Sequence, residues 1–237
     1  MNAPDPAPVE IRGGVELPAR RRDVELTTDD GLTLVGELAL PLDREPVATI
    51  VALHPLPTAG GFMDSHVLRK AAGRLPALAD VAVLRFNFRG VSSPRGRSEG
   101  EFGEGVAEAA DLRAAVRFVA EQGLPTPWLV GWSFGTEVDV AGLLLLSPPL
   151  HRATDDHLRA WNASEVPIVA VVPELDDYLR PEEARSRFAV VPRLEVVAVE
   201  GGKHLWVGEK QTTRVLSEIV ARVAPAALPL PTTWPAG

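Results

Sequence analysis

The feature that most constrains the fold of this chain is a series of short, nearly unbroken apolar runs. Each run has the length of a β-strand but lacks the apolar-polar alternation of a strand with one face in water. Such strands are buried on both faces, as in a parallel sheet covered by helices. The runs are Ala48–Leu53, Val81–Phe88, Trp128–Trp132, Val140–Leu146, Ile168–Val172 and Leu194–Val199.

The stretches between these runs have helical periodicity. Residues 106–120 place Leu112, Val116 and Val119 on one face, and Gly123 follows the end of the pattern. Similar patterns cover Leu68–Leu75 and Thr213–Val223. Strands that alternate with helices predict an α/β fold with a mostly parallel central sheet and helices on both faces.

The N-terminal part of the chain predicts an antiparallel hairpin at one end of this sheet. Val24–Leu26 and Leu32–Leu40 flank the segment TTDDG, whose Asp-Gly pair suits a hairpin turn. We expect a single domain over residues 1–237 with a core of about 22–224, because α/β domains often exceed about 200 residues. Both ends are rich in proline, and we expect them to be flexible.

Composition narrows the choice of partners and compartment. The formal net charge is −8, which argues against nonspecific binding to nucleic acid. No apolar run approaches the roughly 18 residues of a membrane span, and the first residues lack the pattern of a secretory signal. We therefore expect a cytoplasmic protein with no membrane partner; its oligomeric state stays open. The absence of cysteine excludes disulfides, zinc-thiolate sites and a cysteine nucleophile.

A candidate nucleophile follows the apolar run Trp128–Trp132. The segment Gly131-x-Ser133-x-Gly135 fits a sharp turn from strand into helix, in which the serine hydroxyl is exposed and the flanking positions must be small. The following helix would direct its N-terminal amides at the reaction centre. The alternative is a glycine-rich turn with a solvated serine.

The candidate base is His204. It follows the run Leu194–Val199 through residues 200–203, at the carboxyl end of the last expected strand, where open α/β sheets place their chemistry. An imidazole there could accept the proton of a serine hydroxyl. The remaining histidines have other expected places: His66 in a helix, His151 and His157 in an exposed polar segment, and His54 as a brace of the loop after Ala48–Leu53.

The candidate acid lies between the serine and the histidine in sequence. Asp176 follows the run Ile168–Val172, where a carboxylate could hold the imidazole in its reactive tautomer. Asp177 and Glu174 are alternatives, and one of the two aspartates could instead cap the next helix. For an oxyanion hole we expect the backbone amides of Phe134 and Leu56; the prolines on either side of Leu56 have no amide hydrogen to donate.

With these residues in place, the chain resembles the α/β-hydrolase superfamily, in particular small bacterial hydrolases related to dienelactone hydrolase and acyl-peptide-type esterases. The matching segments are LHPLPTAGGFMDSHV, VLRFNFRGVSSPRGRSEG, GWSFG, GLLLLSPPL, PELDDYLRP and GGKHLW. The resemblance implies a Ser133–Asp176–His204 triad that cleaves a small ester or thioester through an acyl-enzyme, with no cofactor or metal.

Two departures from that family pattern stand out. Pro173 occupies a position where the family usually has glycine. The segment from Ser133 to Val140 is also too short for the helix expected after the nucleophile, since a crossover between parallel strands needs about 10–12 residues. Either residues are missing between Gly135 and Ala141, or that helix has collapsed. This shortening motivates an alternative, a noncatalytic binding or interaction protein with the α/β-hydrolase fold.

The sequence also suggests which segments and side chains surround the candidate site. Residues 147–166 leave room for about one short helix and no sizeable lid, which favours an open site for small esters. Trp132 and Trp206 flank the nucleophile and the base, either as an apolar wall for the substrate or as core residues. Arg89, one of several arginines after Val81–Phe88, either attracts an anionic substrate or is structurally paired.

Overall fold

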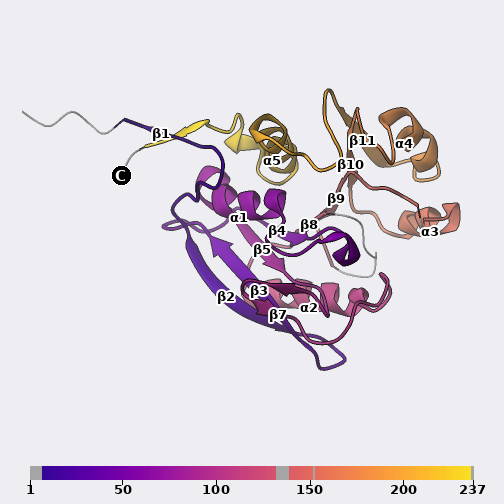
Figure 1. Cartoon of the computed structure of the whole chain (residues 1–237), viewed down its shortest axis with the longest axis horizontal. Helices are drawn as coiled ribbons and strands as arrows, with labels where there is room; N and C mark the ends of the chain where they lie inside the picture. The colour runs from indigo at the N-terminus through magenta and orange to yellow at the C-terminus, as the bar shows by residue number, and fades with distance from the viewer. Residues whose placement is uncertain (1–6, 132–138, 152, 236–237) are drawn as a thin grey trace, which may run out of the picture.

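The structure is a computed structural model that describes residues 7–131, 139–151 and 153–235. Its largest sheet has eight strands in the order β11-β10-β9-β8-β4-β5-β3-β2 (Figure 1). The strands β2 and β3 form an antiparallel hairpin, β3 is antiparallel to β5, and the remaining neighbours are parallel. The strands are β2 (Arg20–Thr27), β3 (Thr33–Leu40), β4 (Ala48–Leu53), β5 (Val81–Phe86), β8 (Trp128–Gly131), β9 (Gly142–Leu146), β10 (Ile168–Pro173) and β11 (Leu194–Val199).

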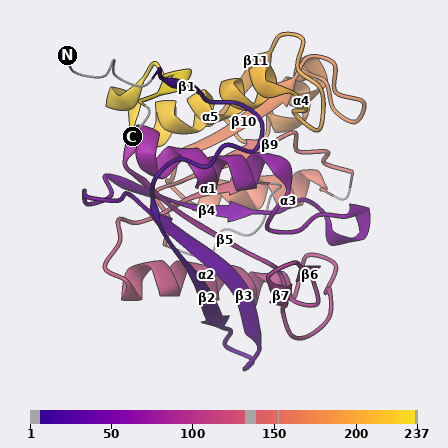
Figure 2. The ribbon, with the colours of Figure 1, turned by 60° about the vertical axis from the view of Figure 1, so that its left-hand side comes forward.

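Helices cover both faces of this sheet. The helices α1 and α5 pack on one face, and α2, α3 and α4 pack on the other; Figure 2 shows α1 and α5 on one side of the sheet and α2 on the opposite side. The helices are α1 (His66–Ala79), α2 (Glu108–Glu121), α3 (Asp155–Ala160), α4 (Pro181–Phe188) and α5 (Glu209–Val223). None of the helices in the described part of the chain is long and apolar enough to cross a bilayer.

The two-sided cover explains the apolar runs in the sequence. In β9, Leu143 and Leu145 belong to the core under α2, α3 and α4, whereas Leu144 and Leu146 belong to the core under α1 and α5. Successive side chains of a strand point to opposite faces, so each face removes one half of the run from water. The predicted fold class, with its mostly parallel sheet and N-terminal hairpin, is confirmed.

The connection from β8 to β9 is short. The two strands are parallel neighbours, with Trp128 opposite Gly142, and residues 132–141 join them. Residues 132–138 lie outside the described part of the chain, so a missing segment and a collapsed helix both stay predictions. The connection from β9 to β10 contains α3 and a short 3-10 turn, Trp161–Ala163, which agrees with the expected absence of a sizeable lid.

The C-terminal segment differs from the expectation of a flexible end. Strand β12 (Thr233–Trp234) pairs antiparallel with β1 (Val9–Glu10), and the Ile11 amide donates to the Thr232 carbonyl oxygen at 2.8 Å. Prolines 225, 229, 231 and 235 do not prevent this pairing, because Thr233 and Trp234 between them keep their amides. Short elements near the middle of the chain are β6 (Ser92–Ser93) and β7 (Gly96–Arg97), which pair as a small hairpin.

Candidate active site

Two of the candidate residues converge because they follow parallel strands. The carboxyl ends of parallel strands lie at one edge of a sheet, and the loops after β4, β10 and β11 leave from that edge (Figure 1). Asp176 lies in the loop after β10, and His204 lies in the loop after β11. The strands β10 and β11 are direct neighbours, so the two loops start side by side.

Asp176 and His204 form a hydrogen-bonded pair. The Nδ1 atom of His204 lies 2.9 Å from Oδ2 and 3.1 Å from Oδ1 of Asp176. A carboxylate can only accept, so Nδ1–H of His204 donates and the neutral ring carries its lone pair on Nε2. This is the tautomer that a base needs to take a proton from a hydroxyl.

The environment of Asp176 keeps its carboxyl group ionised. Burial by itself raises the pKa of Asp176, but the hydrogen bond from His204 and the amide of Tyr178 lower the pKa by more and leave it below the ordinary value. The amides of Tyr178 and Leu179 donate to Oδ1 at 2.8 and 3.2 Å. The carboxylate is therefore negative near neutral pH and accepts the hydrogen bond from Nδ1 of His204.

The other two carboxylates considered for this role have different positions. Asp177 is exposed. Glu174 accepts a hydrogen bond from the Gly201 amide at 2.8 Å and so holds the loop that carries His204. Gly202 in the same loop packs closely, because a Cβ atom there would lie 2.9 Å from the Val199 carbonyl oxygen.

Two side chains from distant parts of the chain hold the backbone at His204. The Ser147 hydroxyl donates to the carbonyl oxygen of His204 at 3.0 Å, and Nε2–H of His66 donates to the carbonyl oxygen of Leu205 at 2.6 Å. These contacts span 57 and 139 residues, respectively. Sequence reasoning placed His66 in a helix without a role and did not single out Ser147. No local pattern marks either residue, because each acts through a partner far along the chain.

Trp206 lies in the protein core and does not line the site. Its side chain is fully buried and belongs to the core between the sheet and the helices α1 and α5. The substrate-wall alternative for Trp206 is therefore wrong, and the core alternative holds. Its backbone has a φ of 54°, an uncommon value for a bulky residue, and Ser147 has a φ of 44°. Strained backbone of this kind persists where tight packing holds it.

The last residue of β8, Gly131, shows why a small residue is needed two positions before the candidate nucleophile. A Cβ atom at Gly131 would lie 2.2 Å from the carbonyl oxygen of Leu53 on the neighbouring strand β4. Only glycine fits so close to another backbone. The next residues, which include Trp132, Ser133 and Phe134, lie outside the described part of the chain, so their roles stay predictions.

His54 braces the loop after β4. A carbonyl oxygen only accepts, so Nδ1–H donates to Pro55 at 2.7 Å, and Nε2 accepts from the Phe88 amide at 3.1 Å. Burial lowers the pKa of His54 to about 4, so the ring is neutral and keeps both bonds at neutral pH. The carbonyl oxygen of Leu56 accepts from the Ala59 and Gly61 amides. The role of the Leu56 amide as an oxyanion donor stays a prediction.

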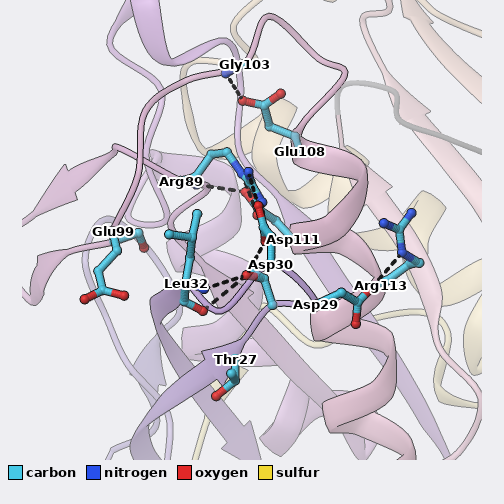
Figure 3. Close-up of polar contacts among 12 residues, drawn as sticks. Thr27, Asp29, Asp30, Leu32, Arg89, Glu99, Gly103, Glu108, Asp111 and Arg113 are labelled. Carbon is cyan, nitrogen blue, oxygen red and sulfur yellow. Dashed lines mark hydrogen bonds and ion pairs between the residues drawn. The ribbon is translucent and has the colours of Figure 1, made fainter.

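Arg89 lies in a buried ion network. Its guanidinium contacts Asp111 on α2 at 2.7 Å and Asp30 in the turn between β2 and β3 at 2.8 Å (Figure 3). Its own amide also donates to Asp111 at 2.9 Å. Nearby, Glu108 accepts hydrogen bonds from the Gly103 and Gly105 amides. The substrate-lining alternative for Arg89 is wrong, because its guanidinium is paired with Asp111 and Asp30. These ion pairs connect the loop after β5 to α2 and to the hairpin of β2 and β3.

This network supports a prediction about stability. Arg89→Ala is expected to lower the free energy of unfolding by about 3–5 kcal/mol, because it removes the cation that neutralises the fully buried Asp111 carboxylate and leaves only the backbone amide of residue 89 as a donor to it. Arg113→Ala is the matched control, since Arg113 pairs with Asp29 at the surface, and a loss below about 1 kcal/mol is expected. Urea unfolding of both variants measures the difference. Equal losses for the two variants would contradict the structural role of Arg89.

No group of three or more histidine, aspartate or glutamate side chains is placed to hold a metal ion within residues 7–131, 139–151 and 153–235. No protein-family model matches the chain. An uncharacterized protein of Rickettsia prowazekii is 32% identical over 119 residues, which cover 45% of this chain and 46% of that protein. The match thus spans just under half the length of the Rickettsia protein.

Solved structures match most of the chain. An α/β serine hydrolase homologue from Coxiella burnetii has a TM-score of 0.68 and 25% identity, and covers 86% of this chain and 97% of its own. An α/β serine hydrolase without a lid from Xanthomonas campestris has a TM-score of 0.69 and 26% identity, and covers 89% and 98%. An esterase from Pyrococcus furiosus shares the fold, with a TM-score of 0.66, 20% identity and coverage of 87% and 94%.

Proposed function

Because the chain belongs to the α/β-hydrolase superfamily, we propose that it is a serine hydrolase that cleaves small esters or thioesters. The observation that carries this proposal is the Asp176–His204 hydrogen bond at the carboxyl edge of the sheet, with the imidazole in the tautomer of a base. The strand β8 ends at Gly131, at the same edge and two positions before Ser133 in the sequence. The similarity of the chain to the solved structures from Coxiella and Xanthomonas, which are described as a serine hydrolase homologue and a serine hydrolase, supports a hydrolase function.

In the proposed mechanism the hydroxyl oxygen of Ser133 attacks the carbonyl carbon of the substrate. His204 Nε2 takes the hydroxyl proton, while Asp176 stabilises the resulting imidazolium. The amides of Phe134 and Leu56 would stabilise the oxyanion of the tetrahedral intermediate. Its collapse breaks the bond to the leaving group, which receives the proton from Nε2 and departs as an alcohol or thiol. Water then repeats the sequence on the acyl-enzyme and releases a carboxylic acid.

The short connection between β9 and β10 supports a preference for small or accessible substrates. It contains α3 and a 3-10 turn but no inserted domain over the site. The Xanthomonas relative is also described as a hydrolase without a lid. A site without such a cover does not depend on a lipid surface to open it.

One observation favours a second candidate function, that of a noncatalytic binding or interaction protein with the same fold. Residues 132–141 join the parallel strands β8 and β9, and this connection is at the lower limit of the about 10–12 residues that a crossover with a helix needs, so it has room for a short helix at most. Without the helix that follows the nucleophile, Ser133 would lose the helix N-terminus that supports its reactivity.

A fluorophosphonate probe separates the two functions, because it reacts with a serine only when a base activates that serine. We expect covalent labelling of the folded protein at Ser133, located by peptide mass spectrometry, and no labelling after heat denaturation. The exposed Ser186 on α4 is an internal control that should remain unlabelled. Folded protein that carries no label at Ser133 would favour the noncatalytic alternative. A panel of p-nitrophenyl esters and acyl thioesters of varied chain length then identifies the acyl group.

A further inference from the structure

Tyr178 places an aromatic ring against the candidate base. The centroids of the Tyr178 and His204 rings lie 4.5 Å apart in an edge-to-face arrangement with an interplanar angle of 61°. On its other side, Tyr178 contacts the ring of His151 in the same kind of arrangement at 5.2 Å. Tyr178 is the only tyrosine of the chain, and 52% of its surface is exposed. An exposed ring beside a catalytic imidazole is available to a ligand.

The backbone that carries this ring is tied to the acid. The amide of Tyr178 donates to Oδ1 of Asp176 at 2.8 Å, and the next residue, Leu179, donates to the same oxygen and is buried in the core. The backbone from which the ring projects is therefore fixed by contacts to the acid, and the ring itself lies between the rings of His204 and His151. A preorganised aromatic side chain binds a flat partner with little loss of conformational freedom.

The chemistry of His204 locates the leaving group near this ring. Nδ1 of His204 is bonded to Asp176, so only Nε2 can pass a proton to the departing oxygen. The leaving group must then lie within about 3 Å of Nε2. Because Tyr178 contacts the same small imidazole ring, an alcohol that departs at Nε2 lies within reach of the Tyr178 ring.

We propose that Tyr178, supported by His151, forms a subsite for an aromatic leaving group, so that aryl esters are preferred over alkyl esters. This inference rests on the proposed serine hydrolase function and adds the class of alcohol to it. An aromatic pair adds a factor of about two to ten in binding beyond the apolar area that it buries. The subsite contributes to catalysis only as far as this contact is kept in the transition state.

The test compares two acetates whose leaving alcohols have similar acidity, phenyl acetate and hexafluoroisopropyl acetate, so that chemical reactivity does not set the ratio. In Tyr178→Leu the ratio of kcat/KM for phenyl over hexafluoroisopropyl acetate is expected to fall about three- to tenfold. Tyr178→Phe, which keeps the ring, is expected to retain the wild-type ratio. Leu42→Ala is a matched control, because Leu42 is an exposed apolar residue that precedes β4, at the opposite edge of the sheet.

Two kinetic results would overturn the subsite. One is an equal loss of kcat/KM for both esters in Tyr178→Leu, which would mean that the ring only positions His204. The other is a wild-type kcat/KM for both esters in that variant. If Tyr178→Phe loses the ratio as well, the hydroxyl and not the ring would be responsible, which also contradicts the proposal.

A binding measurement separates this inference from the proposed function. Phenol and cyclohexanol are titrated into the wild-type protein and Tyr178→Leu, and the imidazole signals of His204 are followed by NMR. Tighter binding of phenol that disappears in Tyr178→Leu supports the subsite even in protein that a fluorophosphonate does not label. Equal binding of the two alcohols to unlabelled wild-type protein, from a preparation that hydrolyses esters and reacts with a fluorophosphonate in a separate sample, would reject the subsite while the hydrolase function stands.

Discussion

Ser133→Ala is expected to lower kcat for ester hydrolysis by roughly 10⁴-fold or more, because the substitution removes the atom that forms the acyl-enzyme. The remaining rate would come from substrate binding and the oxyanion donors alone. Initial rates with phenyl acetate measure this loss, and mass spectrometry shows whether a fluorophosphonate label disappears with it. The fold should be unaffected, because alanine is smaller than serine and needs no more room.

Ser186→Ala is the matched control for this prediction. Ser186 is exposed on the short helix α4 and has no role in the proposed mechanism, so its replacement should leave the rate within about twofold. Ser133→Ala protein that keeps more than a tenth of the wild-type rate would show that another nucleophile acts. Rates that are equally low in all three proteins would favour the noncatalytic alternative.

Asp176→Asn is expected to lower kcat by about 10⁴-fold while the fold stays intact. In the wild-type protein, Oδ1 accepts from the amides of Tyr178 and Leu179, and Oδ2 lies closest to His204. An asparagine keeps Oδ1 on the two amides and so turns its NH₂ group toward Nδ1 of His204. Nδ1 must then accept, the proton moves to Nε2, and the imidazole can no longer take the proton of a hydroxyl.

Asp177→Asn is the control that decides between the two neighbouring aspartates. Asp177 is exposed, and its replacement is expected to change kcat less than about threefold. Thermal unfolding of both variants should show that Asp176→Asn is folded at the assay temperature, which separates lost chemistry from lost structure. A large loss of kcat in Asp177→Asn with a small one in Asp176→Asn would refute the assignment of the acid.

Local patterns were sufficient to predict much of the fold and part of the site. The unbroken apolar runs indicated strands buried on both faces, and β4 and β11 have the expected bounds. Asp176 and His204 could be singled out because each follows such a run, and parallel strands bring their ends to one edge. The need for glycine at position 131 followed from the sharp turn expected there, and Leu53 on β4 is the backbone that it approaches.

Other residues had two possible roles that only packing could separate. Trp206 is core and Arg89 is a structural ion-pair partner, because burial depends on which helices and loops cover a side chain. The C-terminal segment looked flexible from its prolines, yet β12 pairs with β1 at the far end of the chain. The burial of Trp206, the pairing of Arg89 and the pairing of β12 with β1 all depend on contacts between distant residues, so no local pattern predicts them.

By itself the sequence determined the class of the sheet, its leading hairpin and the strand ends at which Asp176 and His204 lie, since these depend on the periodicity and order of residues. The tertiary structure alone decided which side chains contact that pair. Ser147 and His66 donate hydrogen bonds to the backbone at His204, and Tyr178 packs against the imidazole ring of His204. The physical reason is range. Hydrophobic periodicity acts over one strand or helix, whereas a hydrogen bond or ring contact needs two surfaces that meet only after the chain has folded.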